Sequence, residues 1–394
     1  MKKKISYLVS HPIQYFSPLF RDLASDPVID LTVYYCSNPA GLNQADQGFG
    51  RIVTWDVPLL DGYRFEFLKN LSSGSVNNKF WSLINLDIIR KLYRDKSQIV
   101  IVHGWSYVTN WIAIVAARLL GKQVWLRSEN PHNQEMMKPS WLRTIKKAFL
   151  QFGLFKLVNR FLYIGTQNRD FYLYYGVSRE KLIYAPYCVN NDFFLGQAEA
   201  IRGRKEDLKT SLGLSNDSIV ILYSGKYIIK KRPMDLLKAY SALVNKNTVL
   251  IMVGEGYLRQ ELENYCAENK LRNAIFTGFV NQSEISKYYG VADIFVLPSG
   301  IGETWGLVVN EAMVFGLPVI VSATVGSSVD LVKKGENGFV FREGDIEELT
   351  RYLALLVNDE GMRAKAGDSS RRIIEGFTYS VMIENMKKHF KTKK

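Results

Sequence analysis

The stretch LPSGIGETWGLVVNEAMVFGLPVIVS, residues 297–322, carries the strongest pattern in the chain. An apolar run of strand type ends at Leu297, a glycine-containing loop follows, and a helical pattern of apolar residues begins near Trp305. The first backbone N–H groups of a helix have no partner within it, and the helix dipole adds positive charge there. The N–H groups of Trp305, Gly306 and Leu307 therefore predict a site for an anion such as a phosphate.

Two glutamates accompany this predicted anion site. Glu303 and Thr304 lie directly before the helix, and Glu311 lies inside it, about two turns further along at ~1.5 Å per residue. Carboxylates accept paired hydrogen bonds from hydroxyl groups, as sugar recognition requires. With a diphosphate at the helix start, one carboxylate would face a sugar and the other a ribose. In the alternative interpretation, Glu303 only interacts with the helix dipole and Glu311 faces solvent.

A basic loop forms the second pattern. In YSGKYIIKKRP, residues 223–233, an apolar run ends before Gly225, and Lys226 and Lys231 precede a helix that begins at Pro233. Two ammonium groups at the carboxyl end of a strand can neutralise a diphosphate leaving group. The simpler alternative is a solvated basic loop. The spacing of glycine and lysine does not fit a phosphate-binding P-loop.

Other motifs are weak or missing. Gly254 and Gly256 follow an apolar run in VGEGYLRQELE, residues 253–263, but without a third glycine they make only a weak dinucleotide fingerprint and are equally consistent with a tight turn. The chain contains no D-x-D, HExxH or GxSxG motif and no close His/Asp/Glu cluster. We therefore expect no metal and no cofactor, with lysines and helix N–H groups neutralising charge.

Strand-like apolar runs alternate with helical patterns along the whole chain, which predicts an α/β protein with parallel sheets. Residues 196–218 are polar and charged, and we expect the interdomain linker there. The expected domains are 1–200 and 201–394, with a C-terminal helix over 379–391 that packs back on the first domain. Ligands of open α/β sheets bind at the carboxyl ends of the strands, so two such domains predict a cleft site.

We expect the following strands and helices in the first half: strands over 4–9, 31–36, 63–68, 99–103, 123–126, 161–164 and 181–185, and helices over 15–25, 83–95, 107–120, 139–160 and 167–175, with loops over most of 38–80. In the second half we expect strands over 219–224, 248–253, 274–277, 294–297, 318–322 and 338–341, and helices over 233–244, 257–269, 283–289, 305–315, 327–333, 345–358 and 379–391.

Composition limits the class of protein. Three scattered cysteines are expected to be buried and reduced, and the short apolar run after the N-terminal lysines is too brief for a signal peptide. The longest apolar-rich stretch, 111–120, falls short of a membrane span. These features predict a cytoplasmic, soluble or peripheral protein.

The net charge of +13 implies an anionic partner. No acidic residue occurs between Glu135 and Asp170, whereas basic and aromatic residues alternate over 138–160. This region predicts docking on an anionic membrane surface. The alternative is a core-facing amphipathic helix with a solvated basic face. Nucleic acid is not an expected partner because no helix-turn-helix, zinc-finger or RNP pattern is present.

Taken together, these residues resemble glycosyltransferase family 4, a retaining family with the GT-B fold of two Rossmann-like domains facing each other across a cleft. The resemblance runs through nearly all of the second half, from Ser224 to the ENGFVF segment, and the pair Glu303 and Glu311 is its distinctive part. It implies an N-terminal domain for the acceptor and a C-terminal domain for the nucleotide-sugar donor.

The resemblance also implies roles for single residues. Glu303 would contact the donor sugar and Glu311 the ribose, while Lys226 and Lys231 would hold the diphosphate as catalytic residues. The other donor-binding candidates are Gly225, Gly254, Gly256, Val280, Thr304, Trp305, Gly306 and Leu307. The family usually has arginine where this chain has Lys226, and lysine cannot make a bidentate fork.

The first half resembles one bacterial subgroup through HPIQYFSP at residues 11–18. Many family members carry a histidine after the strand that corresponds to 123–126, and here the chain reads RSENPHN. The candidates on the acceptor side are His11, His103, Trp105, Glu129 and His132, for each of which a structural role is the alternative.

The expected function is retaining, metal-independent transfer of a hexose-type sugar from a nucleotide-diphosphate sugar, with UDP favoured over GDP, to a saccharide or lipid-linked saccharide. The resemblance suggests surface polysaccharide or lipopolysaccharide assembly. A sugar-nucleotide epimerase of the same fold and a basic nucleic-acid-binding protein are the alternatives.

Overall fold

A computed structural model describes residues 2–37, 55–72, 79–243 and 247–390. By their contacts, the described residues form two units. The first lies within Met1–Gln44, Val57–Tyr187 and Tyr379–Lys394, and the second lies within Ala45–Asp56 and Cys188–Thr378. The expected domains, 1–200 and 201–394, stay a prediction. Each unit is an α/β layer structure built on one parallel sheet.

The first unit contains a sheet of seven parallel strands in the order β3-β2-β1-β4-β5-β6-β7. Its strands are β1 (Lys3–Val9), β2 (Ile29–Tyr35), β3 (Phe65–Phe67), β4 (Ile99–His103), β5 (Gln123–Arg127), β6 (Arg160–Tyr163) and β7 (Leu182–Tyr184). The central strands are near-continuous apolar runs, as expected when helices cover both faces of a parallel sheet. In the register, Tyr7 of β1 lies opposite Val33 of β2 and Ile101 of β4.

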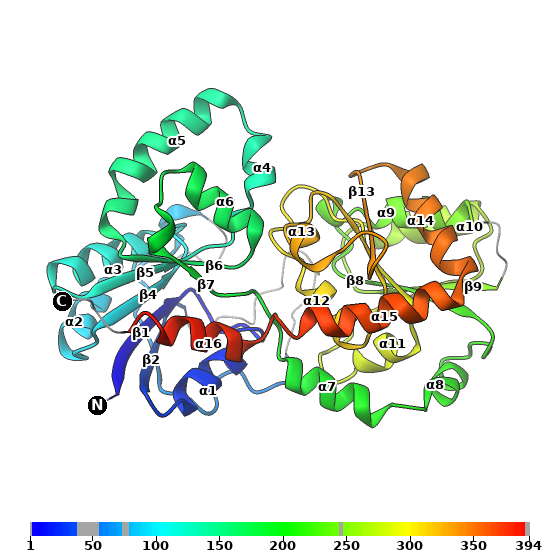
Figure 1. Ribbon diagram of the computed structural model, residues 1–394, viewed down its shortest axis with the longest axis horizontal. Coiled ribbons are helices and arrows are strands. Elements are labelled where there is room, and N and C mark those ends of the chain that lie inside the picture. Colours follow the sequence, from blue (N-terminus) through cyan, green and yellow to red (C-terminus); the bar gives the residue numbers. More distant parts are fainter. Residues whose placement is uncertain (1, 38–54, 73–78, 244–246, 391–394) are drawn as a thin grey trace. The chain divides into compact units, whose positions relative to one another are not determined.

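Helices flank this sheet on both faces. They are α1 (Ser17–Ser25), α2 (Asp87–Arg94), α3 (Val108–Leu119), α4 (His132–Met136), α5 (Ser140–Phe152), α6 (Thr166–Tyr174) and α16 (Tyr379–Lys387). Figure 1 shows α1 and α16 on the opposite side of the sheet from α3, α5 and α6. Tyr379 of α16 donates a hydrogen bond to the carbonyl of Tyr15, and Lys387 forms an ion pair with Asp26 at 3.1 Å.

The second unit contains six parallel strands in the order β10-β9-β8-β11-β12-β13. They are β8 (Ile219–Ser224), β9 (Thr248–Val253), β10 (Ala274–Gly278), β11 (Ile294–Leu297), β12 (Val319–Ser322) and β13 (Gly338–Phe341). Its helices are α7 (Asn191–Ala200), α8 (Lys205–Ser211), α9 (Pro233–Ser241), α10 (Arg259–Glu268), α11 (Ser286–Val291), α12 (Leu307–Val314), α13 (Ser328–Leu331), α14 (Ile346–Asn358) and α15 (Glu360–Ile374). Strands β8, β9, β11 and β12 are almost wholly buried and form the centre of the core.

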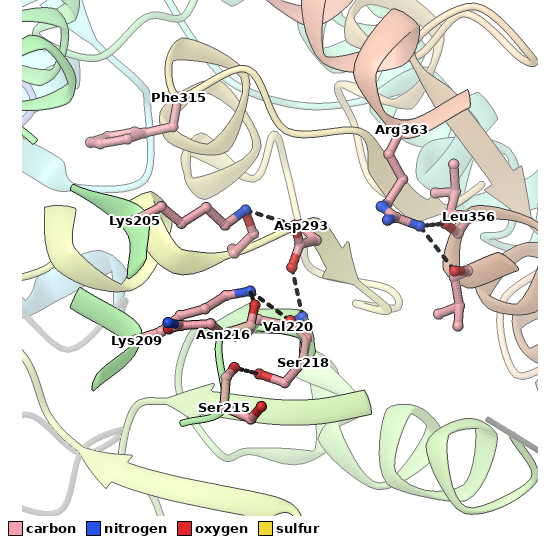
Figure 2. A network of polar contacts seen from close by, with 12 residues as sticks. Lys205, Lys209, Ser215, Asn216, Ser218, Val220, Asp293, Phe315, Leu356 and Arg363 are labelled. Atoms are coloured by element: carbon pink, nitrogen blue, oxygen red, sulfur yellow. Dashed lines mark hydrogen bonds and ion pairs between the residues drawn. The ribbon is translucent and has the colours of Figure 1, made fainter. Parts of the chain in front are cut away.

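The prediction of an interdomain linker over 196–218 is wrong, because this segment contains helix α8 and the end of α7. The ammonium group of Lys209, although charged, is buried against the carbonyls of Asn216 and Ser218 at 2.9 and 2.7 Å (Figure 2). Beside it, the carboxylate of Asp293 accepts from Lys205 and from the backbone N–H of Val220. These contacts fix α8 to the start of strand β8 and to the loop before it.

Three further helix predictions need correction. Helix α15 was not predicted, because Gly367 and two serines weaken its helical pattern; Gly367 is needed where the helix passes close to the carbonyl of Gly316. The helix expected over 139–160 ends at Phe152, where Gly153 breaks it. The helix expected from Trp305 begins two residues later, at Leu307.

Candidate functional site

The centre of the second sheet is its topological switch point. From β8 the chain moves outward through β9 and β10, and then returns to place β11 on the other side of β8. The loops that follow two such neighbouring strands run in opposite directions. A crevice therefore forms between them at the carboxyl edge of the sheet. The basic loop follows β8, and the loop with Glu303 follows β11. The sheet topology therefore brings the two strongest sequence patterns together.

An ion pair joins these two loops. The ammonium group of Lys231 pairs with the carboxylate of Glu303, and both side chains are largely buried. The backbone N–H of Gly300 also donates to the carbonyl of Lys230 at 2.8 Å. Lys226 lies at the start of the same basic loop, and its backbone carbonyl accepts a 3.0 Å hydrogen bond from the buried Tyr223 hydroxyl. Three lysines and one glutamate thus surround the end of strand β8.

The charges of this cluster act on the ammonium group of Lys230. Partial burial lowers the pKa of the Lys230 ammonium group, the carboxylate of Glu303 opposes this change, and the charges of Lys231 and Lys226 lower the pKa further. Neighbouring positive charges that repel one another form a site whose electrostatic energy falls when an anion binds. The cluster is therefore suited to a diphosphate.

Glycines allow the backbone to come close at two points of this site. A Cβ atom on Gly254, directly after β9, would lie 1.9 Å from the carbonyl oxygen of Gly225, so no other residue fits there. Gly306 precedes α12 with a φ of +89° and would place a Cβ atom 2.7 Å from the side chain of Leu297. Glycine at position 306 is therefore required by both its conformation and its packing.

Helix α12 begins at the carboxyl edge of the sheet, and no side chain caps its first turn. Its first N–H groups have no acceptor within the helix, and its dipole is positive at this end. The Trp305 side chain, by contrast, is buried and donates to Asn310 at 2.9 Å. Thr304 and Leu307 lie on either side of this turn and are half-buried.

The second glutamate of the motif is almost fully buried. One carboxylate oxygen of Glu311 accepts a 2.7 Å hydrogen bond from the hydroxyl of Tyr289 on helix α11. The interpretation in which Glu311 faces solvent is therefore wrong. A tyrosine hydroxyl that occupies one carboxylate oxygen holds the carboxyl plane in one orientation. Contact between Glu311 and a ribose stays a prediction.

The remaining donor-side candidates lie at the ends of neighbouring strands. Along the chain, Gly225 follows β8, Gly256 follows β9 and Val280 follows β10. A Cβ atom on Gly256 would meet the backbone of Tyr227, so this loop packs tightly on the basic loop. All of these positions are at the same carboxyl edge.

Sequence reasoning missed a polar network behind the basic loop. Arg232 has a φ of +50° and its guanidinium group contacts both Asp235 and Glu343. The other oxygen of Glu343 accepts from the hydroxyl of Thr324 at 2.6 Å. This network connects three loops that are far apart in the sequence, and only the positively charged run 230–232 gave any signal of it.

The first unit has its own switch point, between β1 and β4. His11 follows β1, His103 ends β4, and Glu129 follows β5, so all three lie at one carboxyl edge. The Nε2 atom of His103 lies 3.2 Å from Glu129 Oε1, while His11 Nδ1 lies 2.9 Å from the hydroxyl of Ser10. The structure therefore brings together three of the five acceptor-side candidates.

The charge states in this cluster follow from its surroundings. Burial alone would raise the pKa of Glu129, but hydrogen bonds from His103 and Tyr187 and the positive charge of Arg127 outweigh it and lower the pKa. Burial, together with the charge of His103, lowers the pKa of His11. At neutral pH the cluster thus pairs a carboxylate with His103 next to a neutral His11. A carboxylate–histidine pair of this kind can accept a proton from a hydroxyl group.

The other two acceptor-side candidates lie elsewhere. Trp105 is half-buried and packs against the core of the first unit, on the rings of Phe155 and Phe171. His132 begins helix α4, with its ring 5.5 Å from that of Tyr174. Their surroundings favour the structural alternative for both.

No group of three or more His, Cys, Asp or Glu side chains that could hold a metal ion is found within residues 2–37, 55–72, 79–243 and 247–390. Among these same residues, none of the helices combines the length and the apolarity that crossing a membrane demands.

Comparison with known proteins agrees with the geometry. Residues 204–373 match the family model described as "Glycosyl transferases group 1". This segment contains the basic loop, both glutamates and all six strands of the second sheet.

Two curated relatives extend this likeness. An uncharacterized glycosyltransferase of Methanocaldococcus jannaschii is 31% identical over 40% of this chain and 41% of its own length. The capsular polysaccharide biosynthesis glycosyltransferase CapM of Staphylococcus aureus is 27% identical over 45% of this chain and 47% of its own length. The chain therefore matches less than half the length of these relatives.

A solved structure covers almost the whole chain. HepE of Anabaena, in complex with UDP and glucose, superposes with a TM-score of 0.71, covers 98% of both chains and is 15% identical. At this identity the likeness shows the fold alone. The fold of the chain is the GT-B fold, with two parallel sheets flanked by helices.

Proposed function

We propose that this protein is a glycosyltransferase that moves a sugar from a nucleotide-diphosphate sugar, with UDP favoured over GDP, to a saccharide or lipid-linked saccharide. One observation carries the proposal. Lys231 and Glu303 form an ion pair at the switch point of the second sheet, Lys226 begins the same basic loop, and helix α12 starts four residues after Glu303 without a side-chain cap. Cations and helix N–H groups suit a diphosphate, and a carboxylate suits sugar hydroxyls.

We assign the donor to the second unit. The diphosphate would replace Glu303 as the main partner of the lysine ammonium groups, which frees the carboxylate to accept hydrogen bonds from the sugar. The ion pair with Lys231 holds the carboxylate of Glu303 in one orientation until the donor arrives. The carboxylate of Glu311, held in place by the Tyr289 hydroxyl, would accept from the ribose hydroxyls.

The proposed chemistry is stabilisation of a leaving group. As the bond between the anomeric carbon and the diphosphate breaks, negative charge grows on the phosphate oxygens. Lys226 and Lys231 neutralise that charge, and the N–H groups of α12 donate to it. The acceptor hydroxyl attacks the anomeric carbon from the face of the leaving group, with retention of configuration, and its proton passes to the departing phosphate.

We assign the acceptor to the first unit, at the pair of His103 and Glu129. The 3.2 Å contact between these side chains places an imidazole and a carboxylate where an acceptor hydroxyl can donate a hydrogen bond. His11 lies at the same sheet edge.

We propose that transfer needs no metal ion, because three lysines already supply the positive charge that a diphosphate requires. We also propose a cytoplasmic enzyme at the inner face of a membrane. The three cysteines are free and buried, which fits a reducing compartment. The CapM relative supports a role in surface polysaccharide assembly, and HepE with UDP and glucose supports a UDP-sugar donor.

The test is an assay of the purified protein with a panel of UDP- and GDP-sugars, with and without saccharide acceptors. A glycosyltransferase releases the nucleoside diphosphate and adds one sugar mass to the acceptor. Conversion of the sugar nucleotide into an isomer without acceptor would favour an epimerase instead. Salt-dependent binding to DNA with no turnover of any donor would favour a nucleic-acid-binding protein.

A further inference from the structure

Helix α5 has an unusual distribution of side chains. Its buried side carries Arg143, Lys146 and Leu150, whereas large apolar side chains point to solvent. The exposed apolar residues are Trp141, Leu142, Ile145, Phe149 and Phe152. At 100° per residue these five fall within an arc of about 100° on the helix surface, which is the width of an amphipathic stripe. The stripe faces outward.

The buried side of α5 explains this orientation. The carboxylate of Glu135 is only 3% exposed, accepts from the hydroxyl of Tyr175 and forms an ion pair with Lys146 at 2.9 Å. The ammonium group of Lys146 also lies over the rings of Phe171 and Tyr175 of the neighbouring helix region. Charge pairing and cation–π contacts thus hold the basic side of α5 against the protein. The interpretation of a core-facing helix with a solvated basic face is therefore wrong.

The exposed apolar surface continues onto helix α3. The ring of Trp111 lies 5.4 Å from that of Phe149, and Val115 and Leu119 follow Trp111 at four-residue spacing along the same side of α3. Leu119 is 83% exposed and Phe152 is 72% exposed. A contiguous apolar surface of this kind normally marks a binding site. We call the exposed residues of both helices the apolar face.

Positive charge borders the apolar face. Exposed Lys156 follows α5, and exposed Arg118 lies on α3 beside Leu119. No acidic residue occurs between Asp95 and Glu129 or between Glu135 and Asp170, and Glu135 itself is buried and paired. Two copies of this face would repel each other, whereas an anionic lipid surface attracts both the cations and the aromatic side chains.

We propose that the apolar face inserts into the headgroup region of an anionic lipid bilayer, with α5 lying parallel to the membrane plane. The helix has thirteen residues and is about 20 Å long, which is too short to cross a bilayer but sufficient to lie in its interface. Tryptophan and phenylalanine enter the acyl boundary, and Lys156 and Arg118 contact the phosphate groups. This orientation brings the first unit to a membrane surface.

The experiment is co-sedimentation of the full chain with vesicles of phosphatidylcholine alone or mixed with phosphatidylglycerol. It needs neither donor nor acceptor, so its outcome is independent of the proposed activity. We expect binding only to the anionic vesicles. Ile145→Glu should weaken it roughly tenfold, because a carboxylate would enter the acyl boundary. Leu355→Glu is the matched control, since Leu355 is an exposed helix residue of the second unit, and it should bind like the wild type.

A second pair of variants tests the charges. Lys156→Ala should weaken binding to anionic vesicles about fivefold, whereas Lys365→Ala, at an exposed position of α15, should not. Equal binding to both kinds of vesicle, or equal loss in Ile145→Glu and Leu355→Glu, would overturn the proposal. So would a wild-type dimer without vesicles that Ile145→Glu converts to a monomer, because the face would then bind a second copy.

Discussion

Glu303 is the residue on which the proposed chemistry depends most. In Glu303→Gln the shape of the side chain is kept while its charge and its ion pair with Lys231 are lost. We expect the turnover number to fall by about 10²–10³, as when a group that stabilises the transition state is removed. UDP lacks the sugar, so binding of UDP should persist, as measured by its thermal stabilisation of the variant. Exposed Glu336→Gln is the matched control. Full activity of Glu303→Gln with its donor would remove Glu303 from the mechanism.

The pair of His103 and Glu129 makes a separate prediction for the acceptor. Glu129→Gln keeps a hydrogen-bond acceptor next to His103 but removes the negative charge that strengthens the pair's hydrogen bond to the acceptor hydroxyl. We expect sugar transfer to slow by about 10²-fold while thermal stabilisation by UDP stays unchanged, because the predicted donor residues lie in the second unit. Glu180→Gln, at an exposed position of the first unit, is the control. An equal loss in both variants would contradict a role for Glu129.

His11 gives the first unit a pH dependence with a definite sign. Burial lowers the pKa of His11 in the folded state, so between the folded and unfolded pKa values the unfolded chain binds more protons. Stability should therefore fall as the pH drops below the ordinary histidine value of about 6.5. We expect His11→Asn to lose part of this slope in thermal unfolding between roughly pH 5 and pH 7. The variant should keep the part of the slope that comes from His389, whose pKa is also lowered by burial. An unchanged slope would contradict the prediction.

Local motifs explain which of these residues were predictable. Lys226, Lys231 and Glu303 each follow a strand whose apolar run is evident, and neighbouring strands place their loops together. The contact between Tyr289 and Glu311 joins residues 22 positions apart on two helices, and no sequence period indicates it. Glu343 is similar, because its partners Arg232 and Thr324 lie in two other loops. Residues in motifs at strand ends can be predicted, whereas partners fixed by tertiary packing cannot.

At the scale of elements, the network of α8 supports a prediction about stability. The carboxylate of Asp293 accepts from Lys205 and from the Val220 N–H at 2.6 and 2.8 Å (Figure 2). Asp293→Ala leaves the buried N–H of Val220 without this acceptor and should cost about 3 kcal/mol. Hydrogen exchange should then become faster over 205–220. Asp368→Ala, which removes an exposed ion pair with Arg371, should cost less than about 1 kcal/mol and leave exchange unchanged.

Helix α5 shows that the sequence can predict a helix without predicting which of its sides faces the protein. Its period was evident in the sequence, but a period cannot say which side of a helix faces the protein. That choice depends on the buried carboxylate of Glu135, which lies outside the helix and pairs with Lys146. Helices α8 and α15 were missed for a related reason: polar residues, serine and Gly367 weaken their patterns, and tertiary contacts stabilise them instead. Alternation of apolar runs was sufficient to predict both sheets.

At the scale of the whole molecule, the donor should stabilise one unit and not the other. A ligand present at a hundredfold excess over its Kd adds about 2.7 kcal/mol to the state that binds it. For a unit of this size, that raises the Tm by several degrees. We therefore expect UDP to shift only one transition in a calorimetric scan that resolves two, with Lys231→Met abolishing the shift and exposed Lys365→Met retaining it.

Repeating this scan and the transfer assay in EDTA tests the charge argument. Lys226, Lys230 and Lys231 supply positive charge where a diphosphate would bind, so neither the shift in Tm nor the turnover number should change when divalent ions are removed. If EDTA abolished both and Mg²⁺ or Mn²⁺ restored them, the lysines would be insufficient. A metal would then share the diphosphate, and Glu303 would have to be considered as its ligand instead of the partner of the sugar.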